Sequence, residues 1–125
     1  MLIRLFRFLS VFPLPVLHFI GVVLGYLVYA LSPTYRKRMR SNMALASYEP
    51  QLGIALREAG KNIMELPLIW LGKPERLAAK VRLENWEIAQ AEIDEKKGVI
   101  FLTPHLGCFE LSAKSIDLRT KMKLL

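Results

Sequence analysis

The sequence predicts an α/β protein that begins with a transmembrane helix, continues with further helices, and reaches the first strand-helix-strand unit of an α/β domain. Residues 8–35 contain no Asp, Glu, Lys or Arg. Towards the other end, the strand-like segments "VRLENWE" and "GVIFLTP" flank a polar helix-like segment. We therefore expect a membrane anchor helix at 1–35, a helical membrane-proximal segment at 36–80 and an incomplete α/β domain at 81–125.

Composition limits the classes of protein that remain possible. With 125 residues the chain is long enough for one domain. It is 53% hydrophobic and carries 18 basic against 11 acidic residues, so it is more apolar and more basic than an ordinary soluble domain. One cysteine cannot form an internal disulfide, and two distant histidines give no metal-ligand spacing. We expect no metal and no cofactor.

The apolar run near the amino terminus, with its core "VLHFIGVVLGYLVYAL", is long enough to cross a bilayer, which takes roughly 20 helical residues. A secretory signal peptide is the alternative, because Arg4 and Arg7 precede the run. Signal peptides have apolar regions of about 7 to 15 residues and end at a small-x-small cleavage site. This run is longer and ends in "YALSPTY", which favours an uncleaved anchor.

The basic run "RKRMR" follows the anchor and contains Arg36, Lys37, Arg38 and Arg40. Such a run can mark a nucleic-acid patch or a solvated helix face. Beside a membrane segment, attraction to anionic lipid is the simpler interpretation, at about 1 kcal/mol per basic residue. We expect no nucleic-acid partner. The excess of positive charge after the anchor predicts a single-pass protein whose carboxyl-terminal part is cytoplasmic.

Two features inside the apolar run have both a functional and an ordinary interpretation. Gly21 and Gly25 form a GxxxG pattern, which can allow two membrane helices to approach closely, although glycine is common in such helices. His18 is ionisable, and an ionisable group in a membrane segment suggests function. It lies near the amino-terminal end, however, where a neutral ring can reach the interface. We favour the ordinary interpretation of both features.

Two helices are predicted after the anchor. Ser32 and Pro33 form an N-cap and first-turn pair, so a helix begins there and continues through "TYRKRMRSNMALA". A second helix begins near Glu49 and is kinked by Pro67 and ended by Gly72. Its apolar stripe has helical spacing: Leu52, Ala55, Leu56, Ala59, Ile63 and Leu66.

The remainder reads as an α/β unit. Residues 81–87 alternate between apolar and polar as a strand does, residues 87–97 read as a polar-faced helix, and residues 98–104 read as a strand apolar on both faces. This order is typical of a parallel sheet whose central strands are buried on both sides. Residues 108–118 then form the next helix.

The segment "TPHLGCFE" carries the candidate chemistry. Ligands of open α/β sheets bind at the carboxyl ends of strands, where His105 lies. Pro104 keeps Thr103 extended, and Gly107 permits a sharp turn. Glu110 then falls in the first turn of the next helix, where negative charge is favoured. An ionised Glu beside an imidazole can orient the ring and stabilise the imidazolium, which makes a general-base dyad. The alternative is a capping Glu and a partly buried His.

Three stretches together resemble a known family: the anchor, "RKRMRSNMALA" and "VRLENWEIAQAEIDEKKGVIFLTPHLGCFE". They are similar to the amino-terminal part of the lipid A biosynthesis late acyltransferases, the lauroyl and myristoyl transferases of bacterial inner membranes. The resemblance implies an acyltransferase-type α/β domain at the membrane. It implies transfer of a fatty acyl chain from acyl carrier protein to a hydroxyl of a lipid A precursor. His105 matches the general base, and Glu110 matches the acid that positions it.

The motif departs from the family at two positions and leaves alternatives open. Cys108 and Phe109 stand where the family often has Asn and Trp. A thiol beside His105 could support a covalent acyl-cysteine route, which the apolar neighbours disfavour. Glycerolipid acyltransferases resemble the motif but usually carry Asp in place of Glu110. The third possibility is a nonenzymatic membrane protein that keeps the dyad without using it.

The end of the sequence predicts an incomplete domain. Only 15 residues follow Glu110, and two strands are too few to bury "GVIFL". The family resemblance also stops after "ELSAKS". We expect a truncated or frameshifted product, or a fragment, with little or no activity by itself. Four basic residues could meet an anionic substrate but are more simply ordinary surface charges: Arg76, Lys80, Arg82 and Lys114.

Overall fold

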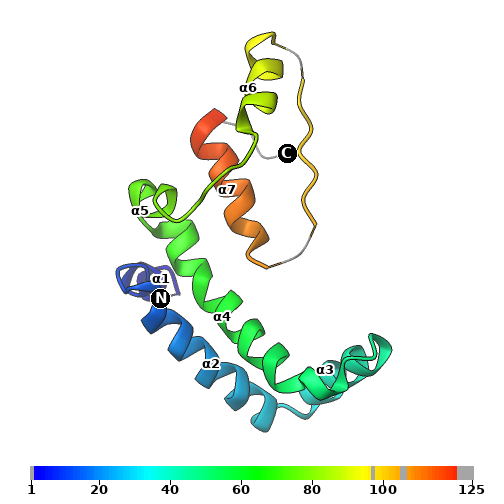
Figure 1. Ribbon diagram of the computed structural model, residues 1–125. Coiled ribbons are helices and arrows are strands. Elements are labelled where there is room, and N and C mark those ends of the chain that lie inside the picture. The colour runs from blue at the N-terminus through cyan, green and yellow to red at the C-terminus, as the bar shows by residue number, and fades with distance from the viewer. Residues whose placement is uncertain (1, 97, 105–106, 121–125) are drawn as a thin grey trace. The chain divides into compact units, whose positions relative to one another are not determined.

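The structure is a computed structural model that describes residues 2–96, 98–104 and 107–120 (Figure 1). Every regular element within these ranges is helical: α1 (Leu2–Leu9), α2 (Leu14–Leu31), α3 (Pro33–Leu45), the short 3₁₀ helix η1 (Glu49–Gln51), α4 (Leu52–Leu71), α5 (Pro74–Ala78), α6 (Trp86–Asp94) and α7 (Phe109–Thr120). The chain divides into two compact units, Met1–Gly72 and Lys73–Leu125.

The predicted α/β class is wrong for the described part of the chain. Residues 98–104 have no regular secondary structure, and the side chains of Ile100 and Leu102 are 88% and 93% exposed. Residues 81–85 are also irregular, and Asn85, at a φ of 54°, turns the chain into α6. A strand is held by hydrogen bonds to a neighbour, and an isolated pair of strands is marginal. No strand is present among the described residues to act as that neighbour.

The helices predicted from caps and periodicity are confirmed. Ser32 precedes α3, and its Oγ accepts a hydrogen bond from the backbone N–H of Tyr35 at 3.3 Å. Gly72 ends α4, and α6 and α7 largely coincide with the segments 87–97 and 108–118 predicted for them, although α6 begins one residue earlier and α7 ends two residues later. The separation of α1 from α2 and the short α5 were not predicted.

The α2–α4 hairpin is the centre of the first unit, because these two helices make its most extensive contact (Figure 1). A Cβ atom added at Gly21 would lie 2.5 Å from the carbonyl oxygen of Gly60, and one added at Gly60 would overlap the carbonyl of Gly21. Gly25 lies equally close to the backbone of Leu56. The GxxxG pattern therefore faces α4 of the same chain. Buried apolar side chains continue this contact: Leu17, Leu56, Met64, Leu68 and Ile69.

Polar contacts join the same two helices. The Nε2 atom of His18 lies 2.7 Å from Oε1 of Glu65, a partner that the sequence did not predict. The hydroxyl of Tyr26 donates to the carbonyl of Gly53 at 3.2 Å. On the surface of α4, the nearby side chain of Lys61 donates to Glu58 at 2.7 Å and lowers the pKa of that carboxyl group.

Part of the basic run closes the carboxyl-terminal end of α2. Arg36 donates to the carbonyl oxygens of Tyr29 at 3.1 Å and Ala30 at 2.5 Å, two acceptors that the helix leaves without internal partners. Arg40 donates to the hydroxyl of Tyr29 at 2.7 Å. Both guanidinium groups also lie within about 6 Å of the Tyr29 ring. These two arginines therefore fix the turn from α2 into α3.

One helix in the described part of the chain is long and apolar enough to cross a membrane, namely α2. It has 18 residues and a mean hydropathy of 2.0, and only 17% of it is buried within the protein. Most of its side chains are therefore exposed on the surface of the protein. This agrees with an association with membranes.

We expect Gly60→Ala to destabilise the first unit by about 1–3 kcal/mol, because the added methyl group would overlap the carbonyl of Gly21. Gly53→Ala is the matched control in the same helix. Its Cβ would lie 3.5 Å from the Tyr26 hydroxyl, an ordinary contact, and replacing a helical glycine with alanine is worth about 0.5–1 kcal/mol in the stabilising direction. Denaturant unfolding in detergent micelles, followed by circular dichroism, measures both. Equal effects of the two substitutions would contradict the close backbone contact.

Candidate active site

Glu110 lies where the sequence places it, in the first turn of α7, and its side chain is half-buried. Gly107 precedes it with a φ of 57°, in the left-handed region that favours glycine, so the predicted turn is confirmed. The first turn of α7 closes when the N–H of Leu111 donates to the carbonyl of Cys108 at 3.0 Å. His105 lies outside the described residues, so the dyad remains a prediction.

Trp86, at the start of α6, contacts the segment before His105 and also α7, the helix that carries Glu110. Its ring is stacked nearly parallel to Phe101, with centroids 6.1 Å apart and an interplanar angle of 7°. The guanidinium carbon of Arg119, on α7, lies 5.4 Å from the centre of the Trp86 ring. The indole N–H donates to Gln90 within α6 at 3.1 Å. Trp86 therefore links the stretch that precedes His105 to the helix that carries Glu110.

Sequence reasoning missed this role because "VRLENWE" was read as a strand. The contact could have been suspected from three residues in nearby segments: Trp86, Phe101 and, in the helix that follows, Arg119. Such residues pair through ring stacking and cation–π contacts whether or not a sheet forms.

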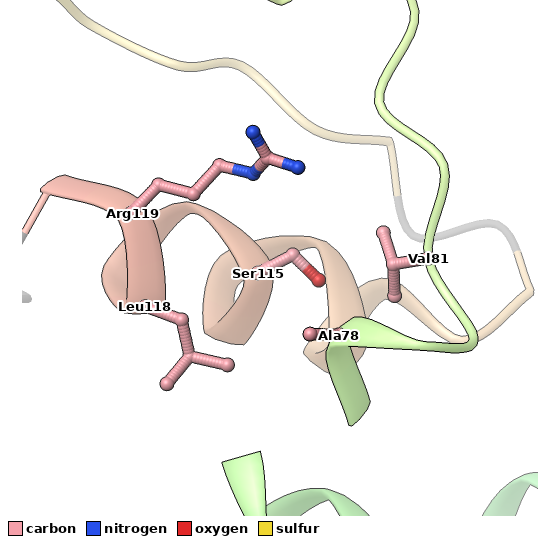
Figure 2. Close-up of a pocket in the computed structure, with 5 residues that line it drawn as sticks. All are labelled: Ala78, Val81, Ser115, Leu118 and Arg119. Carbon is pink, nitrogen blue, oxygen red and sulfur yellow. The ribbon is translucent and has the colours of Figure 1, made fainter. Parts of the chain in front are cut away.

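A small hollow lies between α7 and the end of α5 (Figure 2). Its volume is about 210 Å³, below the range of about 300–1,000 Å³ that is usual for ligand pockets. The buried Ser115 in its wall donates its hydroxyl to the carbonyl of Leu111 at 2.6 Å, so that group is engaged within the helix. The lining is otherwise apolar apart from one cation: Ala78, Val81, Ser115, Leu118 and Arg119. The hollow is too small for a fatty acyl chain.

Two of the basic residues considered as substrate contacts have acidic neighbours. Lys114 lies 3.2 Å from Asp117, one turn further along α7, and Arg82 lies 3.8 Å from Glu84. The Arg82–Glu84 pair is exposed, and such pairs contribute about 0–1 kcal/mol to stability, whereas Lys114 and Asp117 are half-buried. Within the described ranges, no three His, Cys, Asp or Glu side chains are close enough together to hold a metal ion.

Comparison with known proteins assigns the family. The chain matches the family model described as bacterial lipid A biosynthesis acyltransferase over residues 1–123. The chain therefore belongs to the bacterial lipid A biosynthesis acyltransferase family, and the predicted resemblance is confirmed. Comparisons with curated proteins and with solved structures gave no match. The family associates the chain with acyl transfer in lipid A biosynthesis, and so with an acyl donor and a lipid A substrate.

We expect Trp86→Ala to increase the rate of chymotryptic cleavage after Phe101 by about two- to tenfold, because the stacked pair contributes roughly 0.5–1.5 kcal/mol. Trp86→Phe keeps an aromatic ring against Phe101 and should retain most of the protection. Trp70→Ala replaces the other tryptophan, which lies in the first unit against Phe6, and should leave this cleavage unchanged. Unaltered cleavage in Trp86→Ala would show that the stack does not hold the segment.

Proposed function

We propose that this chain is a membrane-attached O-acyltransferase, or a fragment of one, whose reaction moves a fatty acyl chain from acyl carrier protein to a hydroxyl of a lipid A precursor. The observation that carries the proposal is the family match, which covers residues 1–123 and so includes both His105 and Glu110. The position of Glu110 supports it, because a carboxylate in the first turn of a helix is stabilised by the helix dipole.

In the proposed reaction, His105 is the general base and Glu110 positions it. The imidazole accepts the proton of the acceptor hydroxyl as the oxygen attacks the thioester carbonyl carbon of the donor. A new ester C–O bond forms and the C–S bond breaks. The leaving thiolate then takes the proton from the imidazolium, which Glu110 stabilises in the meantime. The thioester is already reactive, so the protein's task is to activate the hydroxyl and to place it beside the carbonyl.

The proposed location is the cytoplasmic side of the bacterial inner membrane. The acceptor is a lipid and the donor is a cytosolic carrier protein, so the reaction needs a protein that stays at the membrane surface. The apolar and mostly unburied surface of α2 supports attachment there. The charge distribution predicts a single-pass crossing, but attachment does not require one, and the contacts of α2 with α4 favour a different arrangement.

The test is complementation of a strain that lacks this acyl transfer, with lipid A analysed by mass spectrometry. Whatever acyl transfer the wild-type chain supports, low if the chain is a fragment, His105→Ala should reduce by about 10²–10⁴-fold, the usual contribution of a general base. Glu110→Gln should cause a smaller loss, because the base remains. Glu87→Gln is the control, since Glu87 occupies the first turn of α6 in the same unit. Equal complementation by wild type and His105→Ala would favour a nonenzymatic membrane protein.

Replacing Cys108 tests whether the thiol forms an acyl intermediate. Cys108 is half-buried, and the proposed mechanism uses no nucleophile besides the acceptor hydroxyl. We expect Cys108→Ser and Cys108→Ala to retain acyl transfer in the same assay. A loss as large as that of His105→Ala, together with a hydroxylamine-sensitive acyl group on the wild-type protein, would establish the covalent route instead.

A further inference from the structure

The α2–α4 hairpin has a polar flank on one side of the seam between its two helices. The residues of this flank repeat at helical spacing on each helix: His18, Tyr26 and Tyr29 on α2, and Arg57, Glu58, Lys61 and Glu65 on α4. Two contacts between the helices support this arrangement: His18 lies 2.7 Å from Glu65, and Tyr26 donates to the backbone carbonyl of Gly53. The other residues are placed on this side by helical spacing. The polar groups of both helices are thus gathered on one side of the hairpin.

The opposite side of the seam is an apolar flank. It contains a hollow of about 160 Å³, formed by side chains from α2, α3 and α4: Leu24, Gly25, Val28, Tyr35, Ala59, Gly60 and Ile63. The surface of α2 that faces away from α4 is also apolar, with Phe19, Val23 and Leu27 at 71%, 50% and 48% exposure. A continuous apolar surface therefore covers one flank of the hairpin and the outer side of α2.

The close packing of the two helices argues against a crossing of the membrane. Gly21 is near the middle of α2 and lies against Gly60. If α2 spanned the bilayer, Glu58 and Lys61, which flank Gly60 in sequence, would lie near its midplane, where charged side chains are costly. A hairpin lying in the plane of the interface keeps these charges in water while its apolar surface enters the lipid.

Both ends of α2 also carry exposed cations. Arg4 and Arg7 are exposed on α1, which precedes α2, and Lys37 and Arg38 are exposed on α3, which follows it. The α1 helix adds exposed apolar side chains between its arginines, as membrane-surface helices do: Leu2, Ile3, Leu5 and Phe8. Cations at both ends of a helix suit contact with the anionic headgroups of one leaflet.

We propose that the first unit binds in the plane of one leaflet of an anionic bilayer, with the apolar flank in the lipid and the polar flank in water. Both ends of α2 then lie on the same side of the membrane. This inference rests on the membrane attachment included in the proposed function, and not on acyl transfer.

The first test asks on which side each end of α2 lies. Single cysteines are introduced as Arg7→Cys and Thr34→Cys in a full-length Cys108→Ser background, and sealed inner-membrane vesicles of both orientations are treated with an impermeant maleimide. The proposal expects both positions to be labelled in inverted vesicles and neither in right-side-out vesicles. Labelling of the two positions from opposite sides would show that α2 crosses the membrane and would overturn the proposal.

The second test compares the two flanks within α4. Lys61→Cys lies on the polar flank and Ile63→Cys on the apolar flank, although Ile63 is 63% exposed in the protein itself. In inverted vesicles the proposal expects at least tenfold faster labelling at position 61 than at 63, and comparable rates after detergent. Equal labelling before detergent, or protection at both positions, would contradict it. Because neither readout requires acyl transfer, its outcome is independent of the His105→Ala test.

Discussion

The contact between Gly21 and Gly60 is the constraint on which the first unit depends. The two backbones approach so closely that neither position has room for a Cβ atom. This proximity allows His18 to reach Glu65 across the seam. It also requires glycine at the contact, because a side chain directed into the seam there would hold the helices apart. At the far end of α2, Arg36 on α3 donates to two of its last carbonyls and so holds the two helices at the turn between them.

The second unit is held together differently. Among its described residues only Leu77 and Ser115 are buried, so a hydrophobic core contributes little. Its elements are joined instead by ring contacts centred on Trp86 and by the packing of α5 against α7. Aromatic and cation–π contacts contribute about 0.5–1.5 kcal/mol each, far less than a packed core. The conformation around the candidate dyad therefore depends on a few identifiable side chains.

The sequence predicted the elements that are determined locally. The cap at Ser32, the stop at Gly72 and the turn at Gly107 each follow from the preferences of one residue, and each is present. The predicted strands at 81–87 and 98–104 are wrong because alternation and a short apolar run describe only an extended chain, whereas a strand also requires a neighbour. The pairing of Gly21 with Gly60 was not predicted, for a related reason: the GxxxG pattern indicates that a close contact is possible but does not identify the helix that makes it.

In the candidate site, too, local features could be predicted from the sequence and long-range contacts could not. The start of α7 is determined by a few neighbouring residues, so the position of Glu110 could be predicted. The role of Trp86 could not, because it depends on contacts with Phe101 and Arg119, which lie 15 and 33 positions further along the chain. The proposed acceptor is a lipid, so the proposed base must work beside a membrane. In our proposal the first unit attaches the chain there, because a hairpin that lies in the interface keeps the charges of α4 in water while its apolar surface enters the lipid.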